Sequence, residues 1–227
     1  MSGGSLQIDV RRPVLTPREA WTLGGLLFLI AITWWRPIYP AEQALHHSLT
    51  VLALVALLLV HRARPLPYAS FLAIVVFLAM HSVAARWIYS FVPYDDWTGA
   101  LFGVRLSELF GWERNNFDRL VHLTYGLCFG PVIFRALHRL RTGWAALAAV
   151  DIVLSTSALY ELFEWAIAMT LAPGDAEAYN GQQGDMWDAH KDMVIATLGA
   201  IIGVGVLLLS LPQRLPNRSV RVVDGDN

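Results

Sequence analysis

The chain has 227 residues, of which 56% are hydrophobic and 15% charged, and its net charge is −1. Soluble domains carry about 25% charged residues, and the mean hydropathy here is +0.47. The composition therefore excludes an ordinary soluble domain and predicts an integral membrane protein. The sequence has no Gly-rich phosphate loop, and membrane topology accounts for its basic residues, so we expect no nucleotide or nucleic-acid partner.

Six apolar stretches have lengths close to the about 20 residues that a helix needs to cross a bilayer. They predict an all-α fold, a polytopic membrane helix bundle with about six transmembrane helices in a single domain over residues 1–227. Proline-containing breaks such as "RPIYP" and "HRARPLP" separate the first three stretches. In chain order the predicted spans are 20–35, 45–60, 68–91, 120–137, 144–171 and 193–211.

Lysines and arginines predict the orientation of this bundle, because short loops rich in them stay on the cytoplasmic side. With the N-terminus inside, 11 of the 17 basic residues fall on the inner side of the membrane. An even number of spans then places both termini in the cytoplasm. The outer side receives ten of the 18 acidic residues, so we expect any polar site to open outward.

The fifth predicted span carries two acidic residues, Glu161 and Glu164, within "SALYELFEWAIA". Residues three apart share a helix face at about 5–6 Å, where two carboxylates repel by roughly 3 kcal/mol at an effective dielectric near 20. Each acid also costs about 2.5–3.5 kcal/mol of insertion near the centre of a span. This face of the helix is therefore predicted to meet other protein groups, protons or a cation.

Two further segments place acidic and imidazole side chains at the same predicted depth. Asp118 and His122 lie four residues apart at the outer start of the fourth span, so they share one helix face. The segment "GQQGDMWDAHKDM" precedes the sixth span, and a helix beginning near Gly184 would carry a stripe of three aspartates: Asp185, Asp188 and Asp192. We expect these groups and the two glutamates to converge on one pocket.

Carboxylates with one or two imidazoles and no thiolate suit a divalent metal ion such as Zn, Mn or Mg. The predicted metal ligands are Glu161, Glu164, Asp118, His122, Asp185, Asp188 and Asp192. The first four are also the predicted catalytic residues, acting as general acid and base. Three further residues are expected to meet a substrate headgroup: Arg86, His81 and Lys191.

Each of these features also has a purely structural interpretation. The paired glutamates could be ion-paired with Arg86 or Arg119, and the Asp-x-x-x-His pair could be a helix cap beside an interfacial histidine. Negative charge at a helix N-terminus accounts for one or two of the three aspartates. His81 alone is more often a core histidine, and Gly199 with Gly203 predicts close helix packing.

Three quoted segments carry a family resemblance: "NNFDRLVHLTYGL", "SALYELFEWAIA" and "GQQGDMWDAHKDMVIATLGAIIG". They resemble the diagnostic segments of an uncharacterised bacterial inner-membrane family typified by YjdF, over residues from about 72 to 205. The order of an Asp-x-x-x-His pair, a Glu-containing helix and an Asp before a Gly-x-x-x-Gly helix is also similar to VanZ-like membrane proteins. The family resemblance implies a multi-pass protein of the bacterial inner membrane and no established activity.

Three functions remain open at this point. The first is a metal-dependent hydrolase or transferase acting on a lipid or lipid-linked substrate, although no nucleophile motif such as G-x-S-x-G is present. The second is a proton- or cation-coupled transporter, in which the carboxylates act as a relay. The third is a non-catalytic membrane binding module. In all three the lipid bilayer is a partner, and a homo-oligomer is compatible with each.

Overall fold

The computed structural model describes residues 14–170 and 182–211, and every regular element in these residues is a helix. The predicted all-α fold is therefore confirmed for the described part of the chain. The described residues form six long helices and two short ones: α1 (Pro17–Thr33), α2 (Pro40–Ala63), α3 (Tyr68–Arg86), α4 (Tyr94–Phe102), α5 (Leu106–Phe110), α6 (Phe117–Ala136), α7 (Thr142–Ala168) and α9 (Asp188–Ser210).

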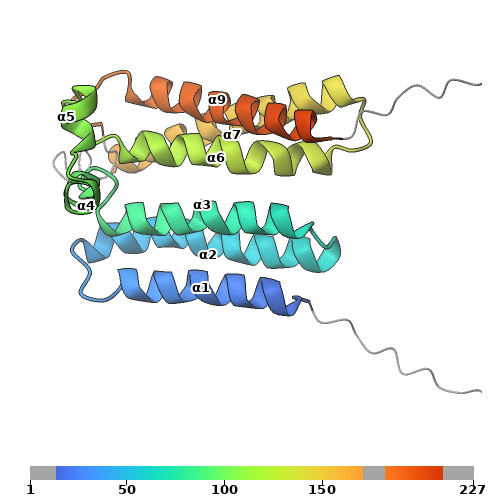
Figure 1. Cartoon of the computed structure of the whole chain (residues 1–227), viewed down its shortest axis with the longest axis horizontal. Helices are drawn as coiled ribbons and strands as arrows, with labels where there is room; N and C mark the ends of the chain where they lie inside the picture. Colours follow the sequence, from blue (N-terminus) through green and yellow to red (C-terminus); the bar gives the residue numbers. More distant parts are fainter. Residues whose placement is uncertain (1–13, 171–181, 212–227) are drawn as a thin grey trace, which may run out of the picture.

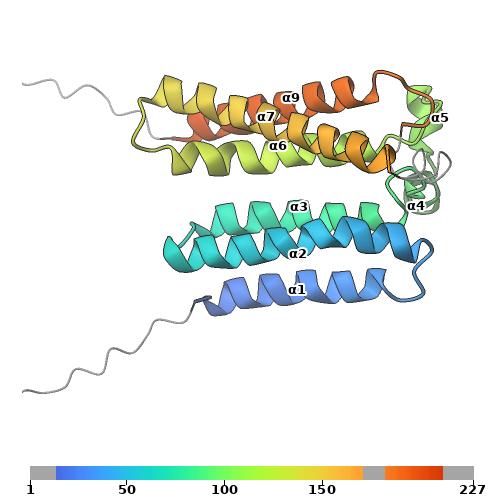
Figure 2. The same ribbon diagram turned by 180° about the vertical axis from the view of Figure 1, so that it is seen from behind.

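The long helices lie roughly parallel in two groups, one of α1, α2 and α3 and the other of α6, α7 and α9 (Figures 1 and 2). Within the first group α3 packs against both α1 and α2, and within the second α6, α7 and α9 all pack against one another. The packing of α3 on α6 joins the two groups, and the short helices α4 and α5 lie together at one end of the bundle.

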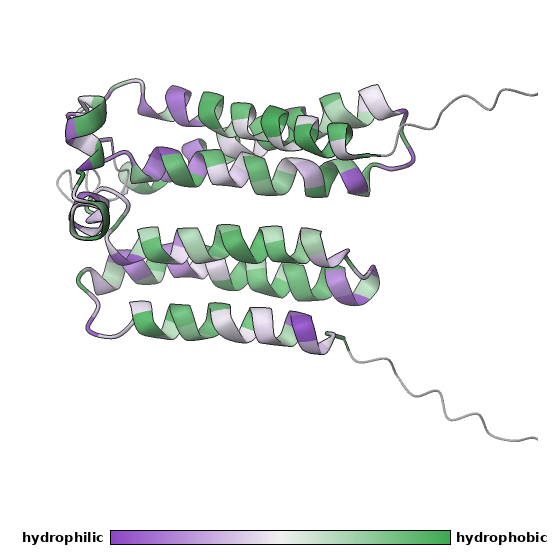
Figure 3. Cartoon of the chain, in the orientation of Figure 1, coloured by the Kyte–Doolittle hydropathy of each residue, from purple (hydrophilic) through white to green (hydrophobic). Residues whose placement is uncertain are grey.

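Four of the helices, α2, α3, α7 and α9, are long and apolar enough to cross a membrane by length and composition. The other two long helices fall short for local reasons. Helix α1 has 17 residues, and α6 carries Asp118, Arg119 and Arg135 among its 20. Hydrophobic residues cover the middle of the long helices, and hydrophilic residues gather toward their ends (Figure 3).

Helix boundaries follow the predicted spans closely except at α2, which begins at Pro40 and not at residue 45, and beside the site. The third helix ends at Arg86 instead of continuing to residue 91, because Ile88 and Tyr89 adopt left-handed backbone conformations with φ of 42° and 61°. The last helix begins at Asp188 and not near Gly184, which has a φ of 81° in the preceding turn. Asp185 therefore lies outside the helix, and the expected stripe of three aspartates is reduced to two.

The Gly-x-x-x-Gly pair of the last predicted span is a packing motif, as expected. A Cβ atom on Gly199 would meet the Leu123 carbonyl oxygen of α6, and one on Gly203 would lie 2.7 Å from the Leu127 carbonyl oxygen. Both glycines therefore mark places where the backbones of α6 and α9 approach too closely for a side chain. This contact positions the acidic ends of the two helices against each other.

Helix α1 begins, and helix α9 ends, at the same end of the bundle, opposite to α4 and α5 (Figure 1). Several residues used in the topology prediction lie outside the described residues, namely Arg11, Arg12, Asp175, Glu177, Arg214, Arg218 and Arg221, as does residue 171 at the end of the fifth predicted span. The cytoplasmic location of this end remains a prediction.

Candidate functional site

Three of the predicted metal ligands come together where α6 and α9 pack near α4 and α5. Asp118 and His122 occupy the first two turns of α6, and Asp192 occupies the second turn of α9. One ligand atom from each of the three lies within 4.8 Å of the other two, and all three residues are buried. The close approach of the two helices thus brings side chains 70 residues apart in the sequence into one cluster.

Helix α7 adds its two glutamates to this cluster. His122 Nε2 lies 3.6 Å from Asp118 Oδ1 and 3.7 Å from Glu161 Oε1. Glu164 lies one turn further along α7, within electrostatic range of Asp118 and Glu161. Among the described residues, Glu161 Oε1 and Asp192 Oδ1 are buried and have no hydrogen-bond partner. We call Asp118, His122, Glu161, Glu164 and Asp192 the acidic cluster.

The remaining two aspartates belong to a neighbouring layer of ion pairs. Asp188 is ion-paired with Arg114, and Arg114 Nη2 also donates to Asp188 Oδ2 at 3.2 Å. Asp185 Oδ2 accepts hydrogen bonds from Arg119 Nη2 at 2.7 Å and from Lys191 Nζ at 2.6 Å. The hydrogen bond from the Lys191 ammonium holds the pKa of Asp185 at about 2, below its usual range, although desolvation opposes this shift.

The charges of the cluster and of the ion-pair layer do not balance. Among the described residues, six carboxylates face three cations. The acidic cluster holds four acids, the layer adds Asp185 and Asp188, and the cations are Arg114, Arg119 and Lys191. A buried charge costs several kcal/mol unless it is paired. The surplus carboxylates therefore need protons or a bound cation.

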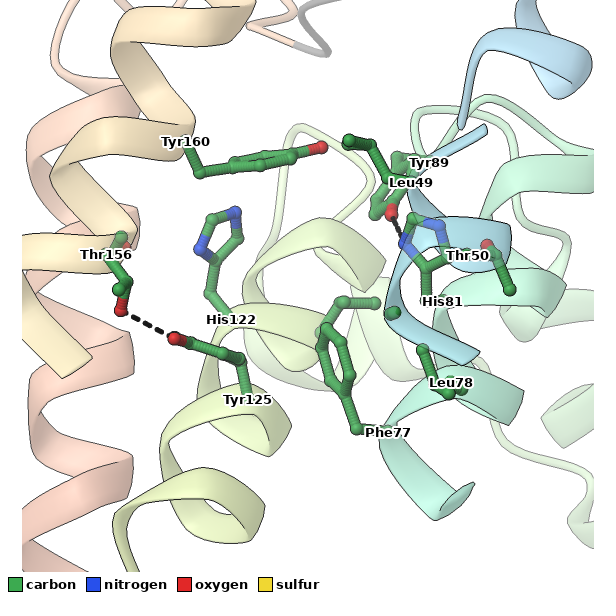
Figure 4. A pocket seen from close by; sticks show the side chains of 13 residues that line it. Leu49, Thr50, Phe77, Leu78, His81, Tyr89, His122, Tyr125, Thr156 and Tyr160 are labelled. Atoms are coloured by element: carbon green, nitrogen blue, oxygen red, sulfur yellow. Dashed lines mark hydrogen bonds between the residues drawn. The ribbon is translucent and has the colours of Figure 1, made fainter. Parts of the chain in front are cut away.

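A cavity of about 210 Å³ lies beside the acidic cluster, lined by residues of α2, α3, α6 and α7 and by Tyr89. His122 belongs to both the cluster and the cavity wall. Figure 4 shows His122, Tyr125 and Tyr160 on one side of the cavity and His81 with Tyr89 across from them. On the first side, the Tyr125 hydroxyl is hydrogen-bonded to Thr156 Oγ1 at 2.6 Å.

The predicted substrate residue His81 lines this cavity, away from the acidic cluster. Its Nε2 donates to the His46 carbonyl oxygen at 3.2 Å, so Nδ1 of the neutral ring accepts from the Tyr89 hydroxyl. The left-handed turn at Ile88 and Tyr89 directs the tyrosine back onto α3. His81 is thus a core histidine with both nitrogens occupied that also contributes to a cavity wall.

The other two predicted substrate residues are not brought to the acidic cluster. Arg86 donates to the backbone carbonyl oxygens of Thr33 and Trp35 at the end of α1. Lys191 is half-exposed and is paired with Asp185. In the described part of the chain, neither Arg86 nor Arg119 forms an ion pair with the glutamates of α7.

Sequence reasoning missed Arg114 and the tyrosines of the cavity. Arg114 lies in the loop before α6, where the sequence indicates only a contribution to membrane topology, yet it is ion-paired with Asp188. Asp118 is not a helix cap, since the N-cap position of α6 is Asn116. The signal that was present is the short separation of Arg114 and Arg119, which puts two guanidinium groups beside the polar first turns of α6.

Comparisons with known proteins agree with the family resemblance. A family model described as "Predicted membrane protein (DUF2238)" matches residues 19–212. The chain is 31% identical over 163 residues to the inner membrane protein YjdF of Escherichia coli (strain K12), covering 69% of this chain and 74% of that protein. No solved structure gives a significant match. These matches lend no support to the likeness to VanZ-like proteins. With long apolar helices and a family match over most of its length, the chain belongs to the DUF2238 family of predicted membrane proteins.

Proposed function

We propose that the acidic cluster holds a divalent metal ion and that the protein is a metal-dependent hydrolase or transferase acting on a lipid or lipid-linked substrate in the bacterial inner membrane. The observation that carries the proposal is the convergence of Asp118, His122 and Asp192, whose ligand atoms lie within 4.8 Å of one another in a buried site. The inner-membrane location follows the name of the E. coli relative.

The donor set fits a metal of the Zn, Mn or Mg class. Carboxylate oxygens and an imidazole nitrogen bind such ions at about 2.0–2.2 Å, and ligand atoms around one ion then lie no more than about 4.4 Å apart. Small side-chain rotations would bring the ligand atoms of Asp118, His122 and Asp192 within that distance of one another. The unpartnered Glu161 Oε1 and Asp192 Oδ1 are the kind of buried acceptors that a cation satisfies.

The cluster also contains groups for proton transfer. A bound metal would polarise a phosphoryl or acyl oxygen and lower the pKa of a bound water. Glu161 lies beside His122, and Glu164 lies one helical turn further along α7 within electrostatic range of Asp118; we assign these two glutamates the roles of general base and acid. Lys191, Arg114 and Arg119 lie in the adjoining ion-pair layer. An anionic headgroup there would compete with Asp185 and Asp188 for these cations.

The unpartnered carboxylate oxygens also favour a second function, proton- or cation-coupled transport. Carboxylates that share a proton would have the same unpartnered oxygens as carboxylates that bind a metal ion. A transport route needs polar groups that continue toward the other end of the bundle. Asp151, the acid on the first half of α7, is exposed instead of buried against the cluster. The enzyme proposal is therefore better supported than the carrier.

Elemental analysis of the detergent-purified protein tests the metal site directly. We expect one divalent ion per chain in the wild type, and loss of that ion in Asp192→Asn and in Glu161→Gln. Chelation should lower the Tm of the wild type, because a ligand at 100 times its Kd stabilises the folded state by about 2.7 kcal/mol.

The matched control for this experiment is Asp96→Asn, which makes the same change on an exposed side chain of α4. It should keep its metal and its Tm. If the monodisperse wild type contains no divalent ion after purification without chelators, the metal site is wrong, and the proton-sharing carboxylates of a carrier become the leading function.

A further inference from the structure

The cavity beside His122 has walls suited to a hydrocarbon chain. Its lining includes Leu49 and Ala53 of α2, Phe77 and Leu78 of α3 and Val121 of α6. Among its lining residues, only the two histidines have side chains that can carry a charge near neutral pH. At about 210 Å³ it is smaller than the about 300–1,000 Å³ of pockets that enclose whole small molecules. It therefore fits part of a ligand.

Helix packing does not close this cavity between α2 and α7. Its floor is made where α3 packs on α6, and its side walls are α2 and α7, which are not among the described helix pairs that pack closely. Helices α2 and α7 lie on the same face of the bundle, nearer the viewer than α3 and α6 in Figure 2. Both α2 and α7 are among the described helices that are long and apolar enough to cross a membrane.

Two of the polar residues that line the cavity lie beside the acidic cluster, whereas His81 and Tyr89 lie across the cavity from them. His122 and Tyr160 contact each other, with ring centroids 6.0 Å apart, on the side of the acidic cluster. Farther along α6, Tyr125 packs on Phe77 with ring centroids 5.4 Å apart. A chain lying in the cavity would thus have an aromatic and aliphatic wall along its length and an imidazole at the end that leads to Asp118 and Glu161.

We propose that this cavity binds one acyl chain of a bilayer phospholipid, which enters sideways between α2 and α7 and places its headgroup end at His122. A void between packed helices forfeits the dispersion contacts of its lining atoms, and a chain from the surrounding lipid restores them. The inference deepens the proposed function, because it names the substrate class and the direction from which that substrate reaches the acidic cluster.

Photocrosslinking in membranes tests the acyl-chain site. The purified full chain is reconstituted into phosphatidylethanolamine–phosphatidylglycerol vesicles that contain a phospholipid with a diazirine on its acyl chain, and labelled residues are read by peptide mass spectrometry. We expect labels inside the cavity, at Phe77 or Tyr125, in addition to labels on the exposed residues Leu52 and Val55 of α2.

Filling the cavity should remove only the first set of labels. Ala53→Trp places an indole in the cavity, whereas Ala56→Trp makes the same change on the exposed face of the same helix. Labelling at Phe77 and Tyr125 should be lost in Ala53→Trp and retained in Ala56→Trp. Leu49→Trp fills the cavity from a second position, and it decides the result if Ala53→Trp fails to give a monodisperse protein.

The outcomes separate this inference from the metal proposal. Cavity labels that are absent from the wild type, or that persist in the folded cavity-filling variants, overturn the acyl-chain site even when the protein contains metal. Cavity labels that behave as expected in the wild type and in Asp192→Asn support the site even when no metal is found, in which case only the proposed chemistry fails.

Discussion

Asp188 and Asp192 lie one helical turn apart on α9 but have different partners. Asp188 is bound by the guanidinium groups of Arg114 and Arg119, whereas Asp192 Oδ1 is buried without a hydrogen-bond partner in the described part of the chain. A satisfied buried charge contributes to the fold, and an unsatisfied one indicates a site that awaits a proton or a cation. The two neighbouring aspartates therefore have different surroundings: Asp188 lies in the ion-pair layer and Asp192 in the acidic cluster.

Removing Arg114 tests the structural role of the ion-pair layer. Its side chain is 11% exposed and that of Asp188 is 4% exposed, so Arg114→Ala leaves a buried carboxylate without its main partner. We expect a loss of about 3–5 kcal/mol in the free energy of unfolding, which is the usual cost of breaking a buried pair. The measurement is Tm and denaturant unfolding of the protein in detergent.

Arg105→Ala is the matched control at an exposed ion pair. Arg105 is 50% exposed and is paired with Asp96 and Glu108, and such surface pairs contribute about 0–1 kcal/mol. Equal losses of stability in the two variants would contradict the role assigned to Arg114.

At the scale of helices, glycine decides how α6 and α9 meet. Gly126 and Gly130 on α6 face Ala196 and Ala200 on α9, so each helix offers small residues at the contact. Glycines lower helix propensity by about 1 kcal/mol each relative to alanine, and close backbone packing offsets that cost. This packing is what carries Asp118, His122 and Asp192 into one cluster.

A larger residue at Gly203 should separate these helices. Its Cβ would lie 2.7 Å from the Leu127 carbonyl oxygen, so Gly203→Val forces the backbones apart and should cost about 1–3 kcal/mol of stability. Gly205→Val, two residues further along the same helix, has no atom within 4 Å of its Cβ position and should have little effect. Thermal unfolding of both variants is the measurement, and a Gly205→Val loss as large as that of Gly203→Val would refute the packing argument.

At the scale of the whole molecule, two helix groups meet mainly through α3 and α6. The site depends on both groups, because the acidic cluster lies in the second and the cavity takes walls from each. The long helices alternate in direction, and the beginning of α1 and the end of α9 lie at the same end of the bundle (Figure 1). The distribution of basic residues predicts that this common end is cytoplasmic.

Cysteine labelling from outside the cell checks that orientation. In a Cys128→Ala background, a membrane-impermeant maleimide should label Asp96→Cys on α4 in spheroplasts, and it should label Arg139→Cys in the α6–α7 loop only after lysis. Both native side chains are exposed, so accessibility depends on the membrane alone. The reverse pattern would place the acidic cluster on the cytoplasmic side.

Much of the candidate site could be predicted from the sequence, because intramembrane acids and their helical spacing are local properties. Glu161 with Glu164, and Asp118 with His122, each share a face on a single helix, and the structure joins both pairs to Asp192. The sequence could not predict that Asp185 and Asp188 lie in the ion-pair layer and not in the acidic cluster, since their partner Arg114 lies 74 residues from Asp188. A pairing over that distance depends on how loops fold at the end of the bundle.

The sequence by itself determined the membrane class, the all-α fold, the family and the approximate positions of the long helices. These follow from composition, from the lengths of the apolar stretches and from sequence motifs, all of which are local properties that can be read along the chain. Only the tertiary structure decided which carboxylates are paired with arginines, and it alone revealed the cavity between α2 and α7. Both depend on the way the glycine contacts of α6 and α9 and the packing of α3 on α6 set the distances between helices.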